Sequence, residues 1–428
     1  MSGVSPSRIV LRSMSSRLLS TVITVLTVAV AVSLMLLLLG LRDAARDSLS
    51  RGTGNMHLLV SRDASPLDAV LNGIFYASPP RAAFPMAKFD QLSSSFPFEW
   101  AVPTQLGDSY RGLRVLATTD AYFDHFEPVM GEPWVVAEGR IFEDTFDLVL
   151  GSEAARLTGL GLGDTAVLTH GFSDHEDHEG HVHDEYTFTV TGILAPSGTL
   201  HDRALFKTLE ATWVVHAHDN RKLRADGPIE LTKVEDLTDR ERLITGMYAR
   251  VFSRPGRDSS AAIQQVFDRL RADPTVTVAQ PAQQLRRLFS VVGNIEGVLL
   301  VMALVVLVSS GLGIMLALYN SMAQRRRQIA VLRVLGASRG KVFELVLTES
   351  LVIGLVGAML GLAGAVVGAG LVGGVFSARV GLDLTPVVLT PVGVYVALGA
   401  VVLSGLAGLI PALMAYRTSV HRNLRPMA

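Results

Sequence analysis

Four long stretches of this sequence contain no Asp, Glu, Lys or Arg, and each is long enough to cross a lipid bilayer. They cover residues 18–41, 297–323, 350–377 and 384–416. A transmembrane helix needs about 20 predominantly apolar residues, because it rises about 1.5 Å per residue across a hydrocarbon layer about 30 Å thick. The sequence therefore predicts a membrane protein with four transmembrane α-helices.

The first stretch has a second interpretation, as a cleaved signal peptide. The apolar core of a signal peptide covers roughly 7–15 residues and is followed by a small-x-small cleavage site. Residues 18–41 exceed that length, and no such site precedes Arg42. We therefore expect an uncleaved membrane anchor.

Basic residues at the ends of the four stretches predict the orientation, because cytoplasmic loops carry an excess of Lys and Arg. They gather before the first stretch, between the second and third, and after the fourth: Arg8, Arg12, Arg17, Arg325, Arg326, Arg327, Arg333, Arg339, Lys341, Arg417, Arg422 and Arg425. The segment between the third and fourth stretches has only Arg379, balanced by Asp383. We therefore expect both termini in the cytoplasm and the long segment 42–290 outside.

The outside segment is predicted to be a large α+β extracytoplasmic (periplasmic) domain inserted between helices 1 and 2. Alternating apolar and polar residues predict strands at 56–62, 113–118, 165–170 and 185–194. Helices are predicted at 151–160, capped by Ser152, and at 259–274. Residues 78–103 contain five prolines and are expected to be rich in loops.

A histidine-rich segment, "HEDHEGHVHDE" at 175–185, interrupts this domain. Five of the eleven histidines of the chain lie in a short window together with several acidic residues: His170, His175, His178, His181 and His183, with Asp174, Asp177 and Asp184 between them. Imidazole nitrogens and carboxylate oxygens suit Zn²⁺, with Ni²⁺ or Cu²⁺ as further options. We predict a metal-binding loop, 170–185, that connects the two strands of a hairpin.

Two other interpretations of this loop stay open: a pH-responsive loop, since histidine titrates near neutrality, and a solvated polar loop. His216 and His218 are candidates to join a site in space, although such histidines are more often surface residues. His57 and His125 are expected to be structural. A metal-conducting pore is disfavoured, because the spans carry Glu296 and Glu349 only near their ends and contain no histidine.

The third stretch repeats glycine at helical spacing, in the pairs Gly357/Gly361, Gly364/Gly368 and Gly370/Gly374. Such small residues let helix backbones approach closely within a bilayer. We expect these pairs to pack helices of one chain, with a dimer face as the alternative.

The segment "RRRQIAVLRVLGASRGKVFELVLTESLVIGLVG" (325–357) resembles a signature of the MacB/FtsX-type permeases of ABC transporters, a family that includes lipoprotein-releasing permeases. The similarity begins with the basic run 325–327 and ends with two acidic residues, Glu344 and Glu349, at the start of the next span. Between them lies the core of the signature: Ile329, Leu332, Arg333, Leu335, Gly336, Ala337 and Ser338. Residues 148–168, 188–206 and 401–426 also resemble parts of this family.

This resemblance implies a contact between the basic segment and a cytoplasmic ATPase. The contact residues implied are Arg325, Arg326, Arg327, Ile329, Leu332, Arg333, Gly336, Ala337 and Ser338. No G-x-x-x-x-G-K-[ST] motif occurs in the chain, so ATP is expected to be used by a separate ATP-binding subunit. The family also implies a second permease subunit, most simply a homodimer, whose outside domains move when ATP is hydrolysed.

The predicted segments follow the chain in order. They are a cytoplasmic interfacial segment (1–17), helix 1 (18–41), the periplasmic MacB-like domain (42–290), helix 2 (291–320), a cytoplasmic coupling loop (321–343), helix 3 (344–375), a short periplasmic loop (376–388), helix 4 (389–415) and a cytoplasmic tail (416–428). The protein is expected in a bacterial inner membrane.

Three functions remain open. The first is a mechanotransmitting permease linked to zinc homeostasis, with a periplasmic metal-binding or substrate protein as a further partner. The second is release of lipoproteins or lipids, and the third is a signalling scaffold that activates an envelope enzyme. We expect no enzymatic activity and no intrinsic cofactor, since the histidine segment lacks H-E-x-x-H. A net charge of −1 gives no indication of nucleic-acid binding.

Overall fold

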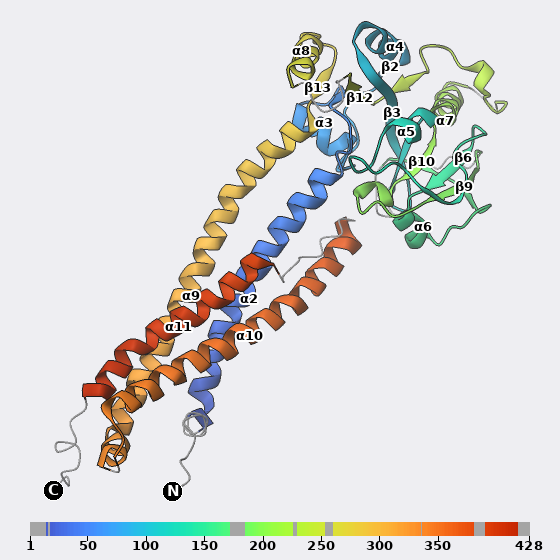
Figure 1. Ribbon diagram of the computed structural model, residues 1–428. Helices are drawn as coiled ribbons and strands as arrows, with labels where there is room; N and C mark the ends of the chain where they lie inside the picture. Colours follow the sequence, from blue (N-terminus) through green and yellow to red (C-terminus); the bar gives the residue numbers. More distant parts are fainter. Residues whose placement is uncertain are drawn as a thin grey trace. The chain divides into compact units, whose positions relative to one another are not determined.

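The computed structural model describes residues 14–15, 18–171, 185–225, 229–252, 260–334, 336–380 and 390–417. The chain divides into two compact units, which we describe separately. The membrane unit comprises Met1–Ala45, Val291–Arg379 and Leu384–Ala428, and the domain comprises Arg46–Ser290 with Val380–Asp383. Figure 1 shows the helices and strands of both units.

Among the described residues, four helices are long and apolar enough to cross a membrane. They are α2 (Leu18–Arg51), α9 (Pro281–Val334), α10 (Arg339–Val380) and α11 (Pro391–Arg417), and their apolar windows lie within Leu18–Arg51, Gly297–Met322, Arg339–Val375 and Pro391–Arg417. The prediction of four spans is therefore confirmed. The large domain between the first and second spans is confirmed as well.

Glycines of α10 bring it close to α2 within the membrane unit. A Cβ atom added at Gly357 or Gly361 would lie 2.7 Å from Val28 or Val32, respectively. Gly364 and Gly368 likewise face Ser33 and Leu37 of α2. These four glycines therefore serve packing within one chain. At Gly370 and Gly374 an added Cβ would meet no atom of the described residues within 4 Å.

In the described part of the domain, the strands form a mixed eleven-stranded sheet. Its strands are β1 (Leu58–Ser61), β3 (Phe98–Tyr110), β4 (Leu113–Thr118), β5 (Val136–Gly139), β6 (Asp147–Leu150), β7 (Thr165–Ala166), β8 (Thr169–His170), β9 (Phe188–Leu194), β10 (Leu205–Thr208), β12 (Gly246–Val251) and β13 (Thr277–Ala279). The order is β13-β1-β12-β3-β4-β10-β6-β9-β5, with β7 paired to β9 and β8 paired to β3. The β10–β4 and β6–β9 pairs are parallel, and the other pairs are antiparallel. A separate pair joins β2 (Phe84–Pro85) to β11 (Leu243–Ile244).

Side chains alternate between the two faces of this sheet, as Leu58 and Leu59 of β1 do, and each face has its own hydrophobic core. The face we call the α7 face is covered by α4 (Met86–Ser95), α6 (Ser152–Thr158), α7 (Leu209–Lys222) and α8 (Ser260–Arg271). The opposite face, the α5 face, is covered by α3 (Pro66–Gly73), α5 (Asp120–His125) and the domain ends of α2 and α9. Two 3-10 turns, η1 (Leu200–Arg203) and η2 (Val234–Asp236), complete the domain.

Two local predictions were wrong. Residues 78–103, expected to be rich in loops, hold β2, α4 and the start of β3: Pro85 is the N-cap residue of α4, and Pro97 directly precedes β3. Helix α6 is capped by Gly151 and not by Ser152. A side chain at Gly151 is excluded, since a Cβ would lie 2.3 Å from the carbonyl oxygen of Asp202.

Candidate functional site

His170 is the one predicted metal ligand whose side chain the structure describes. His175, His178, His181 and His183, together with Asp174, Asp177 and Asp184, lie outside the described residues. His170 is the last residue of β8 and precedes that segment directly. The surroundings of His170 therefore test what the fold itself contributes to a metal site.

The predicted hairpin is only partly correct. Residues 165–170 form two short strands in place of one: β7 pairs antiparallel with β9, whereas β8 pairs with β3. The β3–β8 register places Asp108 directly opposite His170. Side chains of such cross-strand partners lie on the same face, close enough to interact.

A β-bulge in β3 decides on which face Asp108 lies. Regular alternation from Leu106 would place Asp108 on the α5 face with Leu106. The β3–β4 register shifts at this point, so that Leu106 pairs with Leu116 and Asp108 pairs with Val115. Gly107 is the extra residue. Because Val115 belongs to the core of the α7 face, Asp108 lies on that face as well.

Helix α7 supplies a second histidine to Asp108. His216 Nε2 lies 3.3 Å from Asp108 Oδ1, and His170 Nδ1 lies 3.2 Å from the same oxygen. The two imidazole rings meet edge to face, with centroids 4.9 Å apart. One ligand atom from each of the three residues falls within 4.8 Å of the other two. His216, which the sequence offered as a candidate to join a site in space, therefore lies beside His170 in the folded domain.

Lys207 of β10 holds the other oxygen of Asp108. Its ammonium donates to Asp108 Oδ2 at 2.5 Å, and the side chains are only 1% and 2% exposed, respectively. The Lys207 ammonium also lies 5.1 Å from the centroid of the Phe188 ring. A buried ion pair fixes both partners, because removal of either leaves an uncompensated charge in the core. We call Asp108, Lys207, His170 and His216 the Asp108 cluster.

The Asp108 cluster favours a positive charge on His170. The hydrogen bond to Asp108 raises the pKa of His170 above its usual value, and the charges of Asp108 and Asp219 act in the same direction. Burial and the charge of Lys207 oppose this shift without cancelling it. The cluster thus stabilises the charged form of the His170 imidazole.

Sequence reasoning missed Asp108, Lys207 and a buried histidine, His201. His201 lies among the rings of Tyr76, Phe126 and Trp134. The Tyr76 hydroxyl lies 2.7 Å from His201 Nδ1, and His201 Nε2 lies 3.2 Å from the carbonyl oxygen of Gly52. Burial lowers the pKa of His201 to about 4, so it is neutral at physiological pH.

Three further histidines of the described residues have structural contacts. His218, the other candidate to join a site in space, is buried, with Nδ1 3.3 Å from the Thr232 hydroxyl, and is not part of the cluster. His57 Nδ1 accepts a hydrogen bond from the backbone N–H of Val251. His125 stacks on Trp100. These two agree with the structural role predicted for them.

The predicted coupling loop is largely helical. Helix α9 continues to Val334, and α10 begins at Arg339. Gly336 between them has a φ of +101°, which only glycine adopts without strain. The Ser338 hydroxyl accepts from the Lys341 amide at 3.2 Å, as an N-cap residue does. The segment is therefore a helix–turn–helix with its turn at Gly336, Ala337 and Ser338.

Ile329 anchors this helix–turn–helix to the membrane unit. It is buried with Met322 of α9, Val342 and Val346 of α10, and Ala412 of α11. The side chains of Arg325, Arg326, Arg327 and Leu332, and the whole of Leu335, lie outside the description. Arg333 is half-buried, and Ser338 is exposed.

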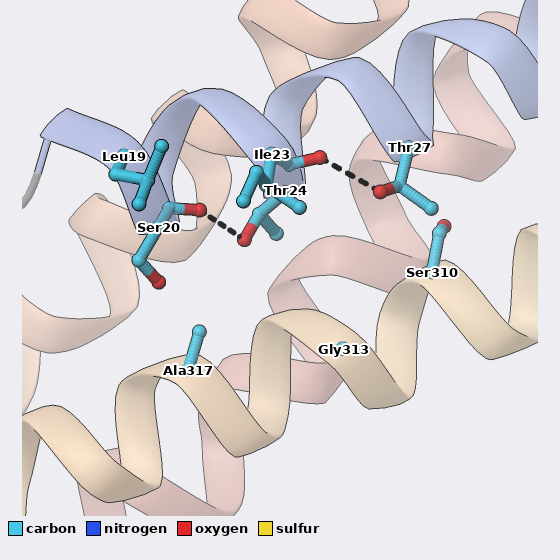
Figure 2. A pocket seen from close by; sticks show the side chains of 8 residues that line it. All are labelled: Leu19, Ser20, Ile23, Thr24, Thr27, Ser310, Gly313 and Ala317. Atoms are coloured by element: carbon cyan, nitrogen blue, oxygen red, sulfur yellow. Dashed lines mark hydrogen bonds between the residues drawn. The ribbon is translucent and has the colours of Figure 1, made fainter.

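A groove of about 360 Å³ lies between α2 and α9 (Figure 2). It is lined by Leu19, Ser20, Ile23, Thr24, Thr27, Ser310, Gly313 and Ala317. The Thr24 and Thr27 hydroxyls donate to backbone carbonyls of their own helix, each at 2.7 Å. The lining contains no ionisable residue.

Two family models match this chain. The MacB-like periplasmic core domain matches residues 21–266, and the FtsX-like permease C-terminal model matches residues 300–420. Macrolide export ATP-binding/permease protein MacB of Nitrobacter winogradskyi is 24% identical over 347 residues, which are 79% of this chain and 47% of that protein. The chain therefore spans about half the length of this curated relative.

Among solved structures, the extracellular domain of the noncanonic ABC-type transporter YknZ from Gram-positive bacteria is similar to part of the chain. The match has 12% identity and covers 52% of this chain and 99% of that one. Its TM-score of 0.28 is too low to support an argument about the fold.

Four apolar helices with a large α/β domain between the first and second define a multi-pass membrane permease of the ABC-transporter class. The MacB-like model alone matches more than half of the 428 residues. The chain belongs to the MacB/FtsX-type permease family.

Proposed function

We propose that this chain is the permease subunit of an ABC transport system in a bacterial inner membrane, with both termini in the cytoplasm. A separate ATP-binding subunit would drive it, and a second permease copy would complete it. Conformational change would pass from the ATPase through residues 325–341 to the domain at 42–290. The joint match of the two family models, the second of which covers the helix–turn–helix that carries the family core, is the observation that supports this function.

The turn at Gly336 supports residues 325–338 as the coupling contact. Its left-handed backbone sets the angle between α9 and α10, and the adjacent Ser338 begins the new helix. Ile329 buries one side of the segment against α10 and α11, so a force on the turn is transmitted to packed helices. Basic residues gather in the same segment, where they would face an acidic surface of the ATPase.

Substitution of Gly336 tests the coupling directly. Affinity-tagged permease is isolated from native membranes and placed in nanodiscs, and the ATPase activity that accompanies it is measured. Gly336→Ala should lower this activity about 5-fold or more, because a side chain at positive φ costs roughly 1–2 kcal/mol. Gly340→Ala is the matched control: Gly340 lies in the first turn of α10, and an added Cβ would make only an ordinary contact, 3.9 Å from Ser338 Oγ.

Two results would contradict the permease proposal. One is that no ATP-binding subunit of the ABC class accompanies the wild-type permease. The other is that Gly336→Ala and Gly340→Ala behave alike. If the ATPase activity depends on Gly336 and an envelope hydrolase is isolated stably bound to the permease, the signalling scaffold is favoured over a transporter.

We further propose that the system handles zinc, with residues 170–185 sensing, buffering or handing over Zn²⁺ to a periplasmic metal-binding protein. The density of histidine and acidic residues supports this, as does the position of His170 beside Asp108 and His216. A deletion strain complemented with a variant that has alanine at all five histidines of 170–185 should grow poorly under zinc limitation. Growth equal to wild type would remove the zinc role and favour lipoprotein or lipid release.

A further inference from the structure

We infer that Asp108, His170 and His216 form a zinc site within the folded domain, one that exists without the histidines at 175–183. The inference deepens the zinc part of the proposed function, because it names the site at which Zn²⁺ is held. It depends on neither the ATPase contact nor the identity of a cargo.

The distances in the cluster match the spacing of ligands around zinc. Zinc binds imidazole nitrogen and carboxylate oxygen at about 2.0–2.2 Å in tetrahedral geometry, so neighbouring ligand atoms lie about 3.3 Å apart. Asp108 Oδ1 lies 3.2 Å from His170 Nδ1 and 3.3 Å from His216 Nε2. Only the two imidazole nitrogens have to approach each other, since all three atoms already fall within 4.8 Å.

The ligands are held by three separate elements of the fold. The bulge at Gly107 turns Asp108 onto the α7 face, the β3–β8 register brings His170 opposite to it, and α7 places His216 over both. Rigid elements position metal ligands more accurately than loops do and require less ordering when the metal binds. The folded domain therefore contributes the preformed part of the site.

Lys207 orients the Asp108 carboxylate for metal binding. It occupies Oδ2 and leaves Oδ1 directed at the two imidazoles, so the carboxylate is oriented before a metal arrives. The ion pair also offsets the charge of Asp108, which moderates the affinity for a cation. A site of moderate affinity with three protein ligands keeps a fourth position for water or for a ligand from another molecule, as transfer of the metal requires.

A hydrogen-bonded network without metal is the competing explanation for the same distances, since both imidazoles can donate to Asp108 Oδ1. The two explanations differ in solution. If the cluster is a zinc site, it binds one Zn²⁺ and loses it when its two imidazoles are removed. A simple hydrogen-bonded network binds no Zn²⁺ at this position.

Zinc binding to the full-length permease in nanodiscs tests the inference, with titration against a chromophoric chelator as the measurement. The double variant His170→Ala/His216→Ala should weaken the tightest site at least 10-fold. The variant with alanine at His175, His178, His181 and His183 should keep one site within about 3-fold of the wild-type affinity. His125→Ala is the matched control, because His125 is exposed and stacks on Trp100 away from the cluster, and it should change nothing.

Co²⁺ in place of Zn²⁺ gives a second measurement. Tetrahedral Co²⁺ with nitrogen and oxygen ligands absorbs visible light far more strongly than octahedral Co²⁺, and this band should persist in the four-histidine variant. The single variants His170→Ala and His216→Ala should each abolish it. Both side chains are partly exposed, at 53% and 24%, so their removal leaves the core intact. Fluorescence of Trp100, Trp134 and Trp213, the three tryptophans of the chain, confirms that each variant is folded.

Two results would overturn the inference: wild-type zinc affinity in the double variant, or loss of all binding in the four-histidine variant. Either would place zinc in the histidine-rich segment or nowhere in the chain, and would leave the dependence of ATPase activity on Gly336 untouched. Conversely, an ATPase result that contradicts the permease proposal does not alter zinc binding to the cluster.

Discussion

Two histidines on opposite faces of the same sheet have pKa values that are shifted in opposite directions. On the α7 face, His170 is half exposed beside Asp108, and its pKa is raised. Among the aromatic side chains of the α5 face, His201 is fully buried, and its pKa is lowered to about 4. The hydrogen bond to Asp108 decides the first case, and loss of water decides the second. The residue type therefore says little about its role until its surroundings are known.

The difference extends to what each region can do. The His201 region contains aromatic rings and neutral hydrogen bonds. These suit a rigid attachment of Gly52, the residue after α2, to the core of the domain. The Asp108 cluster holds a buried ion pair and two histidines that reach the surface, which suits exchange with a ligand. Stability is thus expected to depend on one region and metal binding on the other, except for Lys207.

The largest expected effect comes from Lys207→Met, which leaves Asp108 buried without its ammonium partner. We expect a loss of about 3–5 kcal/mol in the free energy of unfolding, because an uncompensated buried charge is strongly destabilising. Denaturant titration followed by tryptophan fluorescence measures this, since all three tryptophans lie in the domain.

The double variant Asp108→Leu/Lys207→Met is the control for this prediction. Replacing a buried ion pair by apolar residues of similar volume is often neutral or stabilising, so the double variant should recover most of the loss. If the single and double variants are equally unstable, the Asp108–Lys207 pair contributes by shape and packing, and the charge argument fails.

The second effect is acid destabilisation through His201. Its pKa is about 4 in the folded domain and near the usual 6.5 in the unfolded chain. Between these values the unfolded chain binds a proton that the folded domain does not, so the free energy of unfolding falls as the pH is lowered from about 6.5 to about 4. A shift of this size corresponds to about 3 kcal/mol.

His201→Phe isolates this contribution. It keeps an aromatic ring in the cage and removes the titration, so its stability should change less between pH 6.5 and pH 4 than that of the wild type. Its stability at neutral pH should fall by about 1–3 kcal/mol, since the hydrogen bonds with Tyr76 and Gly52 are lost. Identical pH profiles of variant and wild type would show that His201 is not the titrating group.

The smallest effect is expected from His170→Ala. Its side chain is half exposed, and Asp108 retains Lys207 and His216, so the loss should stay below about 1 kcal/mol. His201→Ala is the matched change on the other face and should cost at least about 2 kcal/mol, because it leaves a cavity among aromatic rings. Equal losses of stability in these two variants would show that the histidines of the two faces do not differ in their contribution to stability.

The sequence predicted the architecture well because few physical solutions were available. A run of more than 20 residues without charge has to cross a membrane or fill a core, and four such runs left little choice. The family core around Gly336 was recognised as a motif, and the structure adds its physical reason, a backbone conformation that favours glycine.

The candidate site was predictable only in part. His170 stood out because histidine is rare in the chain and dense around it, and His216 was noticed for the same reason. Asp108 and Lys207 each look like an ordinary polar residue in an alternating strand. Their meeting depends on a parallel β10–β4 pair and a bulge, neither of which leaves a trace in local composition.

The bulge at Gly107 also affects how the site would be recognised in relatives of this protein. A relative that lacks one residue here would show a gap in an alignment, yet a regular strand with that residue missing would still direct the next carboxylate to the same face. Deletion at this position would keep the carboxylate on that face but would remove the Gly107 carbonyl that accepts a hydrogen bond from the Gly171 N–H, whereas loss of the acidic or the basic partner removes the ion pair itself. A search for the same site in other genomes should require both Asp108 and Lys207 and should allow gaps between Leu106 and Asp108.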